Sequence, residues 1–161
     1  MNFTGATLIR GTQQQVWDVL LDPEALRQCL PGCKRFEEVS PGTYEATVTL
    51  GIAAVKGSYN GRVTIGERDE PSSYKLSVEG TGSNGTIRGT GSITLVPTPD
   101  GTSVQWAADA QIGGPIANVG QRLIGGVSKV VAGEFFKCME RQLGQSSAVA
   151  AAAAAEKAEG A

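Results

Sequence analysis

The chain contains no histidine among its 161 residues, so the commonest general base and the usual neutral metal ligand are both missing. It has no block of lysine and arginine, and its formal net charge is −2. A nucleic-acid binder that works by neutralising phosphates is therefore disfavoured. No run of about 18 apolar residues occurs, and the opening MNFTGATLIRG has no apolar signal core. Neither a transmembrane helix nor a cleaved leader is expected.

Cysteine is also scarce, at three residues, and an odd number fits a reducing cytosol better than a disulfide framework. Cys29 and Cys33 flank Pro31-Gly32 in the stretch QCLPGCKRF. Metal binding favours C-x₂-C spacing or supporting histidine, and Cys138 would complete three ligands at best. We interpret QCLPGCKRF as a turn with structural cysteines. A thiol exposed at a partner surface, and metal or redox chemistry, are the alternatives.

At this length the chain is expected to form one domain with a substantial core. Its first part predicts a strand over residues 3–10, followed by two short helices. Thr12 begins the T-x-x-Q pattern of a capping box. Asp22-Pro23 opens the second helix. That helix must end near Cys29, because the residue before Pro31 avoids helical geometry.

Six further strands are predicted from alternating apolar and polar residues. The turns between them are mostly of hairpin length, and such turns join antiparallel neighbours. The predicted strands cover residues 36–39, 43–52, 55–67, 74–82, 86–96 and a run after Pro99-Asp100-Gly101 that extends to Ile112.

A long helix is predicted after Gly113-Gly114, because apolar residues step by three and four from Ile116 to Met139. Gly125-Gly126 and Gly133 lie inside it, and each interior glycine costs about 0.5–1 kcal/mol relative to alanine. Close packing against the sheet is one explanation, and a kink that widens a pocket is the other.

The Ala-rich end of the chain carries no apolar stripe of large side chains. We therefore place the domain at residues 1–144 and interpret residues 145–161 as a flexible tail. We expect this tail to link the domain to a further membrane-anchoring segment.

Glycine is abundant, at 22 residues, which is about twice the average share. Several glycines and alanines share a face with the large apolar residues of the predicted strands. They mark bends of a curved sheet, or they leave a cavity beneath the helix, and the two explanations can coexist. Almost nothing charged faces inward, so such a cavity would accept an apolar ligand. The predicted lining residues are Tyr44, Val48, Tyr59, Gly61, Val63, Leu76, Val78, Ile87, Gly89, Trp106, Ala108, Val119, Leu123 and Val127.

The opening MNFTGATLIRGTQQQVWDVLLDPEALRQCLPGC resembles the CoxG family of carbon monoxide dehydrogenase subunits, which belongs to the SRPBCC, or START-like, superfamily. The segments GIAAVKGSYNGRVTI, GTIRGTGSITL and GGPIANVGQRLIGGVSKVVAGEFF extend the resemblance over residues 1 to about 143. The resemblance implies an α+β helix-grip fold. In that fold a curved, seven-stranded antiparallel sheet surrounds a long C-terminal helix, and two short helices follow the first strand.

The resemblance also implies a function. Family members are accessory proteins of aerobic, molybdenum-containing CO dehydrogenase, and they are associated with recruiting that enzyme to the cytoplasmic membrane. By this resemblance the protein is expected to be cytoplasmic, peripheral to the inner face of the membrane, and to have CO dehydrogenase as its partner.

Our main functional hypothesis is a carrier that binds a respiratory quinone, menaquinone or ubiquinone, without a covalent bond. The quinone ring would lie against an aromatic residue such as Trp106 or Tyr59. The alternative is a docking scaffold without ligand, whose apolar mouth contacts the bilayer or the enzyme, unless Ile52 and Val55 tuck into the domain. The expected mouth residues are Ile52, Ala53, Ala54, Val55, Asn84, Gly113 and Pro115.

A lipid- or polyketide-binding enzyme is the third hypothesis, because a fold does not settle function. The sequence offers neither a Ser-His-Asp set nor a Cys-His pair. Asp109 and Glu79 fall on the outward phase of their strands. We therefore expect a non-catalytic chain without a metal site.

Overall fold

The computed structural model describes residues 1–51 and 56–159, with the backbone alone at residues 119, 121 and 144–159. The elements follow one another in the predicted order, from an N-terminal strand through two short helices and six strands to a long helix. They are β1 (Asn2–Ile9), α1 (Gln13–Leu20), α2 (Pro23–Cys29), β2 (Cys33–Ser40), β3 (Thr43–Leu50), β4 (Gly57–Asp69), β5 (Ser73–Gly82), β6 (Gly85–Thr98), β7 (Gly101–Gly113), the 3₁₀ helix η2 (Pro115–Val119) and α3 (Gln121–Glu159).

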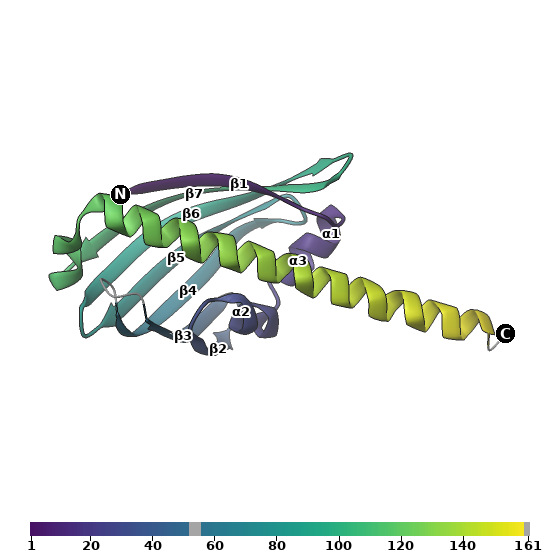
Figure 1. Ribbon diagram of the computed structural model, residues 1–161, viewed down its shortest axis with the longest axis horizontal. Helices are drawn as coiled ribbons and strands as arrows, with labels where there is room; N and C mark the ends of the chain where they lie inside the picture. The colour runs from purple at the N-terminus through teal and green to yellow at the C-terminus, as the bar shows by residue number, and fades with distance from the viewer. Residues whose placement is uncertain (52–55, 160–161) are drawn as a thin grey trace.

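The seven strands form one antiparallel sheet in the order β1-β7-β6-β5-β4-β3-β2. The sheet curves around α3, which crosses its inner face (Figure 1). The predicted strand phase is confirmed. In β5, for example, Tyr74 and Gly80 are buried, whereas Lys75 and Glu79 are exposed. A curved seven-stranded sheet around a long C-terminal helix confirms the predicted helix-grip fold.

The two short helices begin at the residues that the capping patterns predict. Thr12 Oγ1 accepts from the backbone N of Gln15 at 3.2 Å, and Gln15 Oε1 accepts from the backbone N of Thr12 at 2.9 Å. This reciprocal pair completes the capping box of α1. Asp22 accepts from the backbone N of Glu24 at 3.1 Å and caps α2, with Pro23 as its first residue.

The stretch QCLPGCKRF forms the turn between α2 and β2, as predicted. Gly32 has a φ of 75°, a left-handed conformation that favours glycine. Its carbonyl accepts from Thr49 N at 2.8 Å, and a Cβ on Gly32 would collide with the carbonyl oxygen of Thr49. Pairing of Cys33 with Val48 starts β2 earlier than the predicted residue 36.

The prediction of cysteines in a reduced state is wrong for two of the three. Cys29 on α2 is joined to Cys138 on α3 by a disulfide that spans 109 residues, with Cα atoms 5.2 Å apart. The pairing depends on the packing of α3 against α2, which no local pattern in the sequence reveals. Cys33 remains a free, half-buried thiol. The disulfide gives Cys29 and Cys138 a structural role.

The long helix differs from its prediction at both ends. The expected start at Ile116 belongs to η2, which ends at Val119. Gly120 follows with a φ of 97°, and α3 then begins at Gln121. A left-handed glycine ends one helix and lets the chain turn into the next. At the other end α3 continues through the expected flexible tail to Glu159, because alanine has the highest helix propensity. The domain boundary at residue 144 stays a prediction.

The core lies where α1, α2 and the middle of α3 meet one end of the sheet (Figure 1). Trp17 packs edge-on against Tyr74, with ring centroids 5.4 Å apart. Met139 on α3 has 0 % of its surface exposed. Other buried members of this cluster are Ile9, Val16, Leu20, Ala25, Leu26, Cys29, Phe36, Tyr44, Ala46, Ile65, Leu95, Val104, Phe136 and Leu143. The first turns of α3 cover the opposite end of the sheet, outside this cluster.

Candidate functional site

An apolar pocket lies beneath the first turns of α3, at the end of the sheet away from the core. Its volume is about 250 Å³, and no charged side chain lines it among the residues that the structure describes. Concave, apolar surfaces of this kind bind lipophilic ligands. The lining residues are Val48, Leu50, Tyr59, Thr86, Ile87, Ile112, Ile116, Ile124, Val127 and Ser128.

Cross-strand pairing brings the sheet side of the pocket together. Val48 lies opposite Tyr59 in the β3–β4 register, and Ile87 lies opposite Ile112 in the β6–β7 register. On the helix side, the Ser128 hydroxyl donates to the carbonyl of Ile124 at 2.9 Å. This hydroxyl is therefore satisfied within the helix, and the helix wall stays apolar.

Asn84 ties together the loops around the pocket. Its side-chain amide donates to the carbonyl of Lys56, and its backbone carbonyl accepts from Ile116 N at 2.7 Å. The β3–β4 loop, the β5–β6 turn and η2 therefore meet at one place, with Gly113 and Pro115 at the β7–η2 junction. The other predicted mouth residues, Ile52, Ala53, Ala54 and Val55, lie outside the described residues.

The helix above the pocket has room around it. A Cβ placed on Gly125, Gly126 or Gly133 would meet no described atom within 4 Å, so close packing does not explain these glycines. Leu123 is 46 % exposed, and the pocket is lined by Ile124 in its place. Leu123 and Val127 lie on the same α3, four residues apart, but only Val127 reaches the pocket, so the prediction of Leu123 as a lining residue is wrong.

A second hollow, of about 380 Å³, lies between α3 and β1. Trp106 lines this hollow, and its ring stacks on Phe136 with centroids 4.8 Å apart. Trp106 also covers Gly5 on β1, where a Cβ would collide with the indole ring. Trp106 therefore packs from β7 against Phe136 and over Gly5, and it does not line the apolar pocket.

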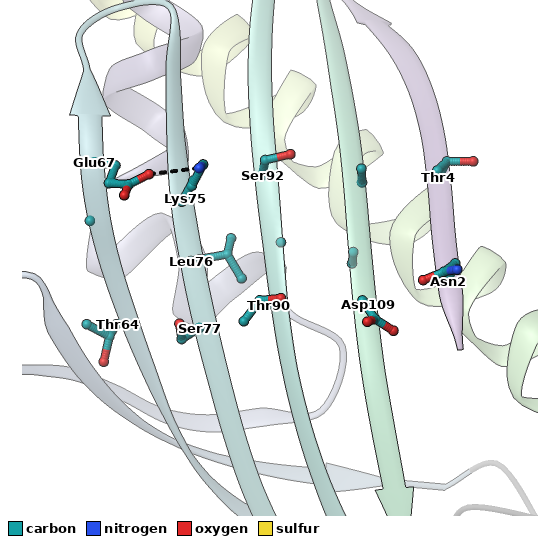
Figure 2. Close-up of a pocket in the computed structure, with 14 residues that line it drawn as sticks. Asn2, Thr4, Thr64, Glu67, Lys75, Leu76, Ser77, Thr90, Ser92 and Asp109 are labelled. Atoms are coloured by element: carbon teal, nitrogen blue, oxygen red, sulfur yellow. Dashed lines mark ion pairs between the residues drawn. The ribbon is translucent and has the colours of Figure 1, made fainter.

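A larger hollow, of about 740 Å³, lies on the outer face of the sheet, opposite α3. Figure 2 shows its polar side chains, with Thr64, Ser77 and Thr90 in one row and an ion pair between Lys75 and Glu67 at 2.9 Å beside them. The hollow is shallow, and unlike the pocket beneath α3 it is lined by the charged side chains of Glu67, Lys75 and Asp109. We therefore do not assign the lipophilic ligand to it.

The sheet glycines have a local reason that is independent of any ligand. A Cβ on Gly61, Gly91 or Gly89 would lie 3.2, 3.1 or 3.0 Å from a carbonyl oxygen of the neighbouring strand. A Cβ on Gly80 would lie 2.9 Å from the side chain of Ile87. Close approach within a curved sheet fits the interpretation of these glycines as bends. No glycine or alanine is among the described lining residues of the pocket beneath α3, so the explanation that these small residues leave the cavity stays a prediction.

Four of the predicted lining residues meet in the pocket: Val48, Tyr59, Ile87 and Val127. Tyr44 is instead buried in the core, where its ring stacks on Phe36 at 5.3 Å. The side chain of Val119 lies outside the described residues. The remaining predicted lining residues on the strands face inward but lie outside the pocket. They are Gly61, Val63, Leu76, Val78, Gly89 and Ala108.

The prediction missed six residues of the pocket lining. Leu50 and Ile112 continue the inward phase of their strands, so extending each alternating pattern to the strand end would have found them. Ile124 and Ser128 depend on which side of α3 faces the sheet, and packing decides that side. The six residues are Leu50, Thr86, Ile112, Ile116, Ile124 and Ser128.

Titratable groups do not form a catalytic set among the described residues. Burial is the main cause that raises the pKa of Tyr44 and of Tyr74, and both tyrosines belong to the core. Burial also raises the pKa of the Cys33 thiol, which disfavours the thiolate needed for nucleophilic attack. Asp109 and Glu79 are exposed on the outer face.

Groups of three or more aspartate, glutamate or cysteine side chains that could hold a metal ion do not occur in the described ranges 1–51 and 56–159. In the same ranges, none of the helices combines the length and the apolar character needed to cross a bilayer.

Known structures share this architecture. A conserved protein from Geobacillus kaustophilus is 37 % identical, with a TM-score of 0.88 over 91 % of this chain and 97 % of that chain. A START superfamily protein from Mycobacterium smegmatis is 16 % identical, with a TM-score of 0.68 over 89 % of this chain and 97 % of that one. A protein from Thermus thermophilus is 14 % identical, with a TM-score of 0.69 and coverages of 91 % and 99 %. The last two show the fold alone.

Sequence comparison gives the family. No curated protein sequence matches the chain. The model of the CoxG family, described as a carbon monoxide dehydrogenase subunit, matches residues 5–144, from the first strand to the end of the core-packed part of α3. Because this match covers more than half of the chain, the protein belongs to the CoxG family of carbon monoxide dehydrogenase subunits.

Proposed function

We propose that this protein is a non-catalytic carrier of a respiratory quinone, menaquinone or ubiquinone, for molybdenum-containing CO dehydrogenase at the inner face of the cytoplasmic membrane. The observation that carries the proposal is the pocket beneath α3. Its walls consist of aliphatic side chains, one tyrosine and two hydroxyl residues. Membership of a family named for CO dehydrogenase supports the choice of partner.

The dimensions of the pocket suggest how such a ligand would lie. A volume of about 250 Å³ is near the lower end of ligand pockets, which span about 300–1,000 Å³. An isoprenoid ligand would therefore extend beyond it, along α3 towards the second hollow, which shares Ser128 with the pocket. The quinone ring would lie against Tyr59, because Tyr59 lines the pocket and Trp106 does not.

A carrier of this kind would connect a cytoplasmic enzyme with a quinone that resides in the membrane. Quinones reside in the bilayer, and an enzyme in the cytoplasm can reach them only through a protein that shields the apolar ligand from water. Recruitment of CO dehydrogenase to the membrane and transfer of the quinone would then be two results of one interaction.

The test is organic extraction and mass spectrometry of the protein purified from a quinone-producing bacterium. We expect a stoichiometric isoprenoid quinone in the wild type. Val127→Trp places an indole in the pocket and should remove the quinone. Val96→Trp is the matched control, because Val96 is 38 % exposed on β6 and lies outside the pocket. A folded wild-type protein without quinone would contradict the proposal.

A docking scaffold without ligand is the second candidate. The polar hollow on the outer face of the sheet favours it, since at about 740 Å³ this hollow exceeds the apolar pocket in size. A quinone-free protein that still binds purified CO dehydrogenase, and loses this binding on Thr90→Arg, would favour the scaffold.

A further inference from the structure

The outward face of α3 between residues 122 and 141 differs from the rest of the protein surface. Leu123 is 46 % exposed and Val130 is 56 % exposed. The two residues are seven positions apart, so they lie on the same face of the helix two turns from each other. Two exposed aliphatic side chains in line on one helix face form the start of an apolar stripe.

Cations surround these apolar side chains. Arg122, Lys129, Lys137 and Arg141 are all exposed on the same part of α3, and none of them forms an ion pair with a described residue. The acids on this stretch are Glu134, which is exposed, and Glu140, which accepts from the backbone N of Arg10 at 3.4 Å. The face therefore has an excess of positive charge in a chain whose formal net charge is −2.

The cations on the outer face of the sheet behave differently. Arg35 and Arg62 both pair with Glu45, at 2.9 and 3.2 Å, and Arg88 pairs with Glu79 at 3.6 Å. These three sheet cations are thus paired within the chain, whereas the four α3 cations remain available to a partner.

Two glycines on the same face of the helix leave its backbone uncovered by side chains. Gly126 and Gly133 are exposed, and a Cβ on either would meet no described atom within 4 Å. They stand between and beside the two apolar residues, so the helix backbone can approach a flat surface closely there. Long lysine and arginine side chains at the flanks can then reach outward to charged groups while their stems lie along the apolar stripe.

From these features we infer that the face formed by Arg122, Leu123, Gly126, Lys129, Val130, Gly133, Lys137 and Arg141, here the α3 outer face, docks on a bilayer that contains anionic lipids. Exposed aliphatic side chains flanked by cations match the boundary between headgroups and acyl chains. Each lysine or arginine near an anionic surface adds to the attraction.

The position of the α3 outer face gives the docking a purpose. The pocket lies under the opposite side of the same helix turns, where Ile124 and Val127 contribute to its lining. Ile87, also in the lining, is 39 % exposed. A protein docked through α3 would hold the pocket next to the bilayer, so an apolar ligand could pass between them with little exposure to water. In this respect the inference rests on the proposed function and names the membrane surface that it uses.

Vesicle flotation with the full chain tests the inference. We expect binding to vesicles of phosphatidylcholine mixed with phosphatidylglycerol, weak binding to phosphatidylcholine alone, and loss of binding as salt rises. Arg122→Gln with Lys137→Gln should lower the partition coefficient about thirtyfold, at roughly 1 kcal/mol per cation. Lys34→Gln with Lys75→Gln removes the same charge from β2 and β5 and should lower it much less.

An apolar pair of variants sharpens this test. Leu123→Asp should abolish vesicle binding, whereas Val39→Asp should not, although Val39 is 48 % exposed on β2. Circular dichroism and cooperative unfolding confirm that each variant folds. Equal binding to neutral and anionic vesicles, or equal losses in the charge variant and its control, would overturn the inference. So would a wild type that ignores vesicles while Leu123→Asp loses binding to purified CO dehydrogenase, because the face would then be a protein interface.

The outcome is separable from that of the proposed function. When quinone is supplied in detergent, without vesicles, the Arg122→Gln and Lys137→Gln variant should bind as much of it as the wild type, because neither residue lines the pocket or the second hollow. A quinone-free wild type that still binds anionic vesicles would contradict the proposed carrier function and support membrane docking through the α3 outer face. A quinone-loaded wild type that does not bind anionic vesicles would support the carrier function and contradict docking through the α3 outer face.

Discussion

The two halves of α3 within the folded domain contrast in how they contact the sheet. From Phe136 to Leu143 the helix is part of the core, where Met139 has no exposed surface and the Cys29–Cys138 disulfide holds it to α2. From Leu123 to Val130 the same helix covers the apolar pocket and exposes large apolar side chains to solvent. One helix thus serves as an anchor at one end and as a pocket wall at the other.

This difference teaches how the fold keeps a binding site while remaining stable. Native stability comes from the well-packed end, where large side chains of α1, α2 and the sheet surround α3. The pocket end contributes less, since glycines there leave space that no described side chain fills. Local stability is expected to follow packing, so the pocket end of α3 should open more easily than the anchored end.

Deletion of core volume should give the largest effect. Met139→Ala removes a fully buried side chain and should lower the free energy of unfolding by about 2–5 kcal/mol. Ile124→Ala removes a half-buried side chain beside existing space, and should lower it by less than about 1 kcal/mol. Urea denaturation measures both. Equal losses would show that the two halves of α3 are equally packed and would break the comparison.

Loss of the disulfide should come next. Cys138→Ser should lower the free energy of unfolding of the oxidised protein by about 2–4 kcal/mol, because the bond closes a long loop. Cys33→Ser should have little effect, since Cys33 is a free thiol. A reductant should destabilise the wild type and leave Cys138→Ser unchanged in urea denaturation. If thiol titration finds three free thiols in the oxidised protein, the anchor is made by packing alone.

A glycine on the pocket half should be replaceable with a gain. Gly126→Ala should raise the free energy of unfolding by about 0.5–1 kcal/mol, because alanine is the better helix former. The position has room for a Cβ. Gly80→Ala on β5 lacks that room, since its Cβ would lie 2.9 Å from Ile87, and should destabilise the protein. A loss of stability on Gly126→Ala would show that α3 packs closely at this point.

The smallest effect concerns α2, to which the anchored half is bound. Hydrogen bonds from Arg27 and then Gln28 lower the pKa of Glu24 to about 2. Because the pKa of Glu24 is lower in the folded state, its carboxylate stabilises the protein at pH values above the ordinary pKa of 4.5. This contribution is lost as the pH falls towards 2. The pair is exposed, so salt should weaken it. The Tm of Glu24→Gln should therefore fall less steeply than that of the wild type across this pH window, and identical profiles would exclude the contribution.

Local sequence patterns predicted much of the architecture. The capping box at Thr12, the Asp22-Pro23 helix start and the turn at Pro31-Gly32 depend on neighbours within a few residues. Strand phase was equally readable, because alternation on a sheet that buries one face leaves a strong period of two. These signals gave the sheet, the order of elements and four of the pocket residues.

Only the tertiary structure decided the rest. The Cys29–Cys138 bond joins residues 109 positions apart, and their meeting depends on where α3 crosses α2. The packing of α3 against the sheet places Ile124 in the pocket and leaves Leu123 exposed. Trp106 stacks on Phe136 because the curvature of the whole sheet sets which inward residues reach the core. Sequence periodicity gives the face on which a side chain lies, but the distance between two packed elements decides whether that side chain fills a core or lines a pocket.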